Sequence, residues 1–230
     1  MKGLDKMVSV IVPVYNEEKV LLESAVWFTN LSKYAELIFV DGGSLDASFK
    51  IAQGYGKVIQ SKRGRAAQMN CGAGLAKGDI LLFLHVDSNI SAQALESIKV
   101  KISVDGFIGG CLTQRIDNEA FIYRLIEAQG NFRARSSRVF YGDQGIFVRK
   151  DIFWELGGFP EEPIMEDILF TKKLRKRGNT VVLPDRIMVS PRRWEKKGII
   201  KTTFLFNLIY ILYCLKVPLH NIKIFYEDLR

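Results

Sequence analysis

Short apolar runs alternate with longer amphipathic stretches over the first half of the chain. Four runs are rich in β-branched and aromatic residues and lack sustained polar alternation, at residues 8–14, 36–41, 57–61 and 79–87. Strands covered on both faces of a sheet show this pattern. Helical patterns fill the gaps at residues 17–31, 45–54 and 65–76. The alternation predicts right-handed βαβ units and an α/β fold, with a mostly parallel central sheet and helices on both faces.

The second half of the chain is less regular. Its pattern predicts helices at residues 91–103, 119–134 and 166–177, and strands at residues 107–116, 145–149 and 180–183. No repeat or Gly/Ser-rich linker divides the chain, so we expect one main domain over residues 1–195. An apolar run with basic flanks follows, and residues 196–230 are expected to form a helical extension.

Polar side chains follow three of the predicted strands. Asn16 and Glu17 follow the first strand, Asp41 and two glycines follow the second, and His85 and Asp87 end the fourth. Each group alone is compatible with a helix cap or a turn. In an open parallel sheet, however, ligands bind beyond the carboxyl ends of the strands. The fold therefore brings these groups to one edge and predicts a ligand site there.

Several ligand classes are disfavoured at this edge. The first strand-to-helix turn has no G-x-G-x-x-G motif, which argues against a nicotinamide or flavin site, and the chain has no P-loop motif. It also lacks the G-x-S-x-G motif of many serine hydrolases. A nucleotide bound here would need a metal ion to neutralise its phosphates. His85 and Asp87 suit that ion, because in an extended chain they point the same way.

Seven motifs resemble those of the family 2 glycosyltransferases and occur in the same order. They are VSVIVPVYNEE (8–18), FVDGGSLD (39–46), GRAAQMNCGA (64–73), GDILLFLHVDS (78–88), GDQGIFVRKDIFWELGGF (142–159), ED (166–167) and RRW (192–194). The resemblance covers residues 8–195 and extends to the small subgroup without a large transmembrane domain. It implies the GT-A fold, typical of nucleotide-diphospho-sugar transferases. It further implies inverting, metal-dependent transfer of a sugar from a nucleotide-diphosphate donor to a hydroxyl of a sugar or lipid-linked acceptor.

The resemblance also implies roles for individual residues. Asp87, the last carboxylate of the D-x-D motif, would bind Mg²⁺ or Mn²⁺. Asp167 of the ED pair would be the general base that takes the proton of the acceptor hydroxyl. The residues implied in nucleotide-sugar binding are Pro13, Tyr15, Glu17, Asp41, Asp87, Arg193 and Trp194.

Alternatives stay open at several positions. His85 replaces the first D-x-D carboxylate, and either ligates the metal as a neutral imidazole or contacts ribose or phosphate. Arg65 precedes a helix and either binds a phosphate or belongs to a solvated basic turn. Gln144 either meets the acceptor or hydrogen-bonds its own loop. Asp167 begins a helix, which tends to lower its pKa, so a base role requires burial or a neighbouring acid such as Glu166.

The net charge of +8 is concentrated in one segment. Residues 172–201 hold eleven Lys and Arg against two acids, whereas the rest of the chain holds 22 against 23. A nucleic-acid-binding protein is an alternative for such a charge, but no recognition motif accompanies it, and we expect no nucleic-acid partner. A sugar nucleotidyltransferase is a second alternative, but a glycine-rich, lysine-containing loop is missing after the first strand.

The uncharged residues 202–215 are almost entirely apolar. A helix of this length covers about 21 Å, which is short of the roughly 30 Å hydrocarbon core, so we expect no membrane span. Its basic flanks suit a helix lying on an anionic membrane surface, and the alternative is packing against the domain or a homodimer partner. Three cysteines without metal-site spacing indicate reduced thiols and a cytoplasmic protein, peripheral at the inner face of the cell membrane if the helix binds lipid.

Overall fold

The computed structural model describes residues 6–227. The apolar runs of the first half form β1 (Val8–Val14), β2 (Glu36–Asp41), β3 (Lys57–Gln60) and β4 (Ile80–Phe83). These strands are neighbours in the order β3-β2-β1-β4, and each pair is parallel. The prediction of a parallel sheet is confirmed for this half, where β1 and β4 are buried on both faces as their apolar sequences indicate.

The second half extends the same sheet to eight strands with mixed directions. The strands are β5 (Ser88–Ile90), β6 (Gly109–Ile116), β7 (Ile146–Arg149) and β8 (Thr180–Val189), and the sheet continues in the order β4-β7-β6-β8-β5. The β7 strand is antiparallel to both β4 and β6, and β5 is antiparallel to β8, whereas β6 and β8 are parallel. Four of the seven strand pairs among the described residues are therefore parallel.

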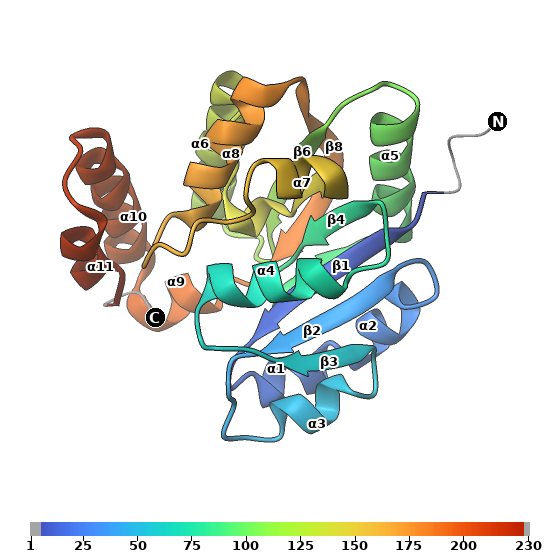
Figure 1. Ribbon diagram of the computed structural model, residues 1–230. Helices are drawn as coiled ribbons and strands as arrows, with labels where there is room; N and C mark the ends of the chain where they lie inside the picture. Colours follow the sequence, from blue (N-terminus) through green and yellow to red (C-terminus); the bar gives the residue numbers. More distant parts are fainter. Residues whose placement is uncertain (1–5, 228–230) are drawn as a thin grey trace.

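Helices cover both faces of the sheet (Figure 1). One face packs on α1 (Glu18–Glu23), α2 (Ala25–Leu31), α3 (Ser48–Ala52) and α5 (Ala92–Ser103), and the other on α4 (Arg65–Leu75), α7 (Lys150–Glu155) and α8 (Glu166–Arg177). Neighbouring residues of β1 contact opposite layers, since Val10 and Val12 belong to the first core and Ile11 to the second.

The fourth predicted strand is too long. We expected it to reach residue 87, but β4 ends at Phe83, and Val86 and Asp87 form a turn in which the Ser88 amide donates to the His85 carbonyl oxygen at 3.1 Å. The argument that His85 and Asp87 point the same way in an extended chain was therefore wrong. Both residues nevertheless line the same cavity.

The remaining helices gather beside the second half of the sheet. They are α6 (Phe121–Ser137), the 3₁₀ helix η1 (Gly142–Gln144), α9 (Arg192–Lys197), α10 (Ile199–Cys214) and α11 (Leu219–Glu227). Figure 1 shows α10 and α11 side by side at one edge of the molecule, where they share a small apolar core with Ile164. No helix within residues 6–227 has the length and hydropathy that a membrane span requires. The expected domain boundary at residue 195 falls inside α9, and the division stays a prediction.

Candidate active site

The loops after β1 and β2 are joined into one wall at the carboxyl edge of the sheet. Asn16, at a left-handed φ of 53°, donates from its backbone amide to Ser44 Oγ at 2.9 Å, and its side-chain oxygen accepts from the Leu45 amide at 2.8 Å. Both carboxylate oxygens of Asp41 accept from the Ser44 amide, at 2.8 and 2.9 Å. Asp41 is only 1% exposed, so its carboxylate holds this wall in place.

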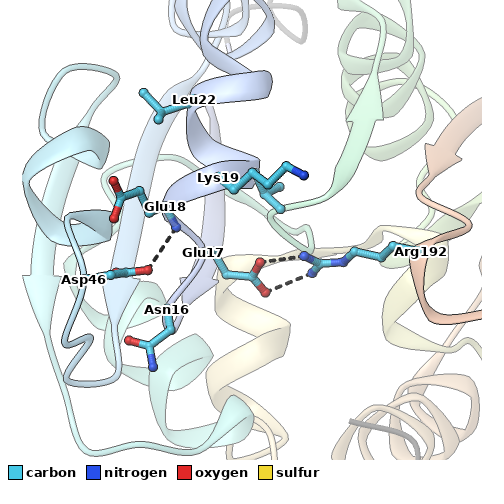
Figure 2. A pocket seen from close by; sticks show the side chains of 8 residues that line it. Asn16, Glu17, Glu18, Lys19, Leu22, Asp46 and Arg192 are labelled. Carbon is cyan, nitrogen blue, oxygen red and sulfur yellow. Dashed lines mark hydrogen bonds and ion pairs between the residues drawn. The ribbon is translucent and has the colours of Figure 1, made fainter. Parts of the chain in front are cut away.

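The residues expected at the nucleotide lie along this wall. The ring of Tyr15 faces the guanidinium of Arg63, whose Cζ is 3.9 Å from the ring centroid. Glu17 precedes α1 and lines a surface pocket of about 440 Å³, drawn in Figure 2. Its carboxylate accepts two hydrogen bonds from Arg192, which reaches it from the start of α9. Pro13 belongs to the end of β1.

A cavity of about 1100 Å³, here called the central cleft, opens next to this wall. It brings together segments far apart in the sequence, among them the loop before α4, the turn after β4, the loop before α8, and one side each of α6 and α10. The predicted site residues in its lining are Arg65, His85, Asp87, Glu166, Asp167, Arg193 and Trp194.

Asp167 lies in the first turn of α8 with its side chain against η1. Its Oδ2 atom accepts from the Gly142 amide at 2.6 Å. Burial raises the pKa of Asp167 to about 7, and the negative charge of the adjacent Glu166 adds to this effect. The Gly142 hydrogen bond and the charge of Arg65 oppose it, but burial prevails over them. A carboxyl group that titrates near neutral pH is suited to accept a proton.

Glu166 connects the start of α8 to the start of α4. It is 4% exposed, and its Oε1 atom is 3.4 Å from Arg65 Nη1 at the start of α4. The preceding residue, Met165, has a left-handed φ of 62°, which is rare for a side chain of this size. Such strained backbone tends to occur at functional sites, because only surrounding contacts can maintain it.

His85 presents an unpartnered nitrogen to the same place. Its Nε2 atom is buried and makes no hydrogen bond to the described residues, and burial holds the pKa of His85 well below its usual value. A Cβ atom on Gly142 would lie 3.0 Å from this nitrogen and 3.4 Å from Asp167 Oδ2. Glycine at position 142 therefore keeps open the space between a neutral imidazole and the elevated-pKa carboxyl group.

The fit to a divalent cation rests on two side chains. Within residues 6–227, no group of three or more His, Cys, Asp or Glu side chains is placed to hold a metal ion. Asp87 supplies one carboxylate and His85 one free nitrogen, both in the wall of the central cleft. This partial set fits a Mg²⁺ or Mn²⁺ ion that takes its other ligands from substrate phosphates and water, and it does not form an all-protein cage.

Arg193 and Trp194 connect the cleft to α10. Trp194 is 8% exposed and packs edge-on against Tyr123 and Phe206, with ring centroids 6.1 and 6.3 Å away. The Arg193 guanidinium lies 5.6 Å from the Phe206 ring centroid. The tryptophan thus fixes α9, and α9 in turn carries Arg193 into the lining of the cleft.

Gln144 makes the loop hydrogen bond that was one of its two alternatives. Its Oε1 atom accepts from the Tyr141 amide at 3.1 Å and from Arg133 Nη2 at 3.3 Å. The residue is 1% exposed and does not belong to the lining of the central cleft. Its contact with an acceptor stays a prediction.

Three residues at the site were not singled out from the sequence. Arg192 pairs with Asp87 and Glu17, and Asp143 accepts a hydrogen bond from Gln114 at 2.7 Å. The Arg133 guanidinium stacks over the Tyr141 ring, 3.1 Å from its centroid. Arg192 and Asp143 belong to the RRW and GDQG motifs, so their place in these motifs could have identified them as site residues. Arg133 is one of several arginines on α6, and nothing in the sequence distinguishes it.

Comparison with known proteins gives matches over most of the chain. Residues 9–157 match glycosyl transferase family 2. Glycosyltransferase AglE of Haloferax volcanii is 29% identical over 189 residues, which are 74% of this chain and 62% of that protein. The chain thus spans less than two thirds of this relative.

Solved structures share the fold at low sequence identity. The mannosyltransferase PcManGT of Pyrobaculum calidifontis, in complex with GDP-Man and Mn²⁺, superposes with a TM-score of 0.70 at 18% identity, covering 97% of this chain and 70% of that one. S. aureus TarS in complex with UDP-GlcNAc gives a TM-score of 0.65 at 22% identity, covering 80% of this chain and 58% of that one.

Proposed function

The chain belongs to glycosyl transferase family 2, and on this basis we propose that it transfers a hexose from a nucleoside-diphosphate donor to an acceptor hydroxyl in the central cleft. The observation that carries the proposal is the position of Asp167. Its carboxyl group, with a pKa near neutrality, faces the same space as His85 and lines the same cavity as Asp87. A proton acceptor and a candidate diphosphate site thus flank one cleft.

The donor is expected to lie along the wall formed by the loops after β1 and β2. Complexes of related folds with UDP-GlcNAc and GDP-Man support a nucleotide sugar as the donor class. Asp87 and His85 would hold a divalent cation together with the diphosphate, as the Mn²⁺ complex of PcManGT supports in general terms. When bound, this cation would supply positive charge to the departing diphosphate. Arg193 lines the cleft and would add to this charge.

The acceptor hydroxyl would attack from the side of Asp167. Asp167 Oδ2 takes the hydroxyl proton as the bond to the sugar forms, and the nucleoside diphosphate leaves from the opposite face. One base and no enzyme nucleophile suffice for this step, and a single in-line displacement inverts the configuration at the anomeric carbon. The hydrogen bond from Gly142 orients the carboxyl group for it.

The pH dependence of transfer tests this role. Only ionised Asp167 accepts a proton, so kcat/KM should rise about tenfold per pH unit in acid and level off above about pH 7. Donor affinity is measured over the same range, so that a loss of donor binding is distinguished from protonation of Asp167. A rate that stays level down to about pH 5 would exclude a base with this pKa.

We also propose peripheral contact with an anionic membrane through α10 and α11, which would suit a lipid-linked acceptor. The side chains of Ile200, Phe204, Leu215 and Ile224 are 64% to 85% exposed. Exposed lysines lie beside them at positions 196, 201, 216 and 223. Apolar side chains interleaved with basic ones are typical of helices that lie in an anionic interface. Localisation at the inner membrane face and a homodimer stay predictions.

Substitution of the exposed apolar residues tests the membrane contact. The triple change Ile200→Ser, Phe204→Ser and Ile224→Ser should lower partitioning onto phosphatidylglycerol vesicles by about tenfold or more, since each side chain would lose buried apolar area. Flotation measures the bound fraction. The matched control, Val26→Ser with Leu45→Ser, changes exposed residues outside α10 and α11 and should have no effect. Equal flotation of both variants and the wild type would contradict the proposal.

A further inference from the structure

Arg192 connects two carboxylates of the donor site through a single guanidinium group. Its Nη1 and Nη2 atoms donate to the two oxygens of Glu17 at 2.6 and 2.9 Å (Figure 2). Its Nε atom lies 2.8 Å from Asp87 Oδ2. The three residues come from the loop before α1, the turn after β4 and the start of α9, so only the folded chain brings them together.

The guanidinium opposes the binding of a divalent cation at Asp87, because it occupies the Oδ2 atom of this carboxylate. A Mg²⁺ ion binds carboxylate oxygens at about 2.1 Å. A guanidinium 2.8 Å from the same oxygen would place two positive groups side by side, with strong repulsion in a partly buried site. The Asp87 side chain is only 19% exposed, so water screens this repulsion poorly. Arg192 and a divalent cation therefore compete for Asp87 Oδ2.

We propose that Arg192 is an internal cation that occupies Asp87 in the donor-free enzyme and yields this carboxylate to the divalent cation when the donor binds. The inference rests on the proposed function, because it takes Asp87 as the metal ligand. It makes Arg192 a positioning residue that controls the order of binding. Metal alone binds weakly, since it competes with the arginine for Asp87 Oδ2.

The contacts of Arg192 indicate which partner it releases. Glu17 holds it by two parallel hydrogen bonds, the bidentate geometry that is strongest for a guanidinium, whereas Asp87 holds it by one. Arg192 therefore stays anchored on Glu17 while its Nε atom turns from Asp87 to the donor diphosphate. The diphosphate compensates both cations at once, so donor and metal strengthen each other's binding by the same factor.

Manganese binding without donor tests the proposal on the full chain. Electron paramagnetic resonance measures free Mn²⁺ during titration of the wild type, Arg192→Gln and Arg192→Lys, each checked for folding by circular dichroism. Without nucleotide, Arg192→Gln should bind Mn²⁺ about tenfold or more tighter than the wild type, because the competing charge is gone. Arg192→Lys, which keeps that charge, should bind as weakly as the wild type. Adding UDP or GDP should strengthen Mn²⁺ binding less in Arg192→Gln than in the wild type.

Two further variants show which carboxylate binds Mn²⁺ once Arg192→Gln has removed the guanidinium. Asp87→Asn in the Arg192→Gln background should abolish the gain in Mn²⁺ affinity, whereas Glu17→Gln in that background should preserve it. The inference would be overturned if the gain in Mn²⁺ affinity were lost on Glu17→Gln. It would also be overturned if Arg192→Gln and the wild type bound Mn²⁺ equally well without nucleotide, while the wild type still bound Mn²⁺ in the presence of UDP or GDP. Absence of Mn²⁺ binding by every variant, even with UDP or GDP, would instead overturn the metal-dependent function on which it rests.

Discussion

Replacing Asp167 by Asn is expected to lower the rate of sugar transfer by about 10³-fold, within the range for loss of a general base. The amide keeps an oxygen for the Gly142 hydrogen bond, so the loop geometry is preserved while the proton acceptor is lost. Donor affinity should change little, because Asp167 acts on the acceptor. Transfer assays and calorimetric donor titrations on the same preparation separate the two quantities.

A stability measurement shows whether Asp167→Asn still folds. The folded-state pKa of about 7 lies above the unfolded value near 3.8, so the wild type loses stability as pH rises between these values. The neutral amide does not carry this cost. The variant should therefore melt at a higher temperature than the wild type at about pH 8, and the difference should vanish below about pH 4.

Glu166→Gln is the matched control for the adjacent carboxylate. It removes a negative charge that raises the pKa of Asp167, so the acid limb of the transfer rate should move to lower pH while the plateau remains. If Asp167→Asn instead kept full transfer to a true acceptor, another group would be the base.

Replacing Asp87 by Asn should have the second largest effect. Transfer is expected to fall by about 10²-fold or more, the size seen when a group that stabilises transition-state charge is removed. The metal-dependent part of donor affinity should be lost as well. Asp79→Asn is the matched control. Asp79 is exposed and lies just before β4, whereas Asp87 lies in the turn after it. Activity indifferent to both chelator and Asp87→Asn would contradict a metal held at this position.

The sequence predicted the first half of the sheet well because burial dominates there. Residues 8–14 and 36–41 form strands over the expected ranges, and their side chains are almost all buried. The fourth strand was overextended because Leu84 and Val86 are buried although they lie beyond β4, and an apolar composition does not distinguish a buried loop or turn from a strand. The predicted helix over residues 17–31 is divided at Ser24 into α1 and α2.

Short elements of the second half could not be predicted. The strand β5 has three residues and exists through its pairing with β8, while η1 is held by the Tyr141 and Gln144 contacts. Such segments have little periodicity of their own, so tertiary contacts decide their structure. Because β5 and η1 lie in segments that connect longer elements, missing them does not change the predicted position of the site at the carboxyl edge of the sheet.

The candidate site was predictable where it depended on strand ends and on simple electrostatics. Glu17 follows a predicted strand, and His85 and Asp87 end another. A base role for Asp167 was expected to require burial or an acidic neighbour, and both raise its pKa. The pairing of Arg192 with Glu17 joins residues 175 positions apart. A sequence shows the basic segment around Arg192 but not which of its charges turns inward.

Calorimetric titration of the wild-type chain with UDP- and GDP-sugars, with Mn²⁺ and with chelator, tests the central claim most directly. We predict saturable binding of at least one nucleotide sugar in Mn²⁺, about tenfold or more weaker in chelator and likewise in Asp87→Asn. A folded protein that binds none of these donors in Mn²⁺, or binds one equally well in chelator and in Asp87→Asn, would contradict a metal-assisted nucleotide-sugar site at this edge of the sheet.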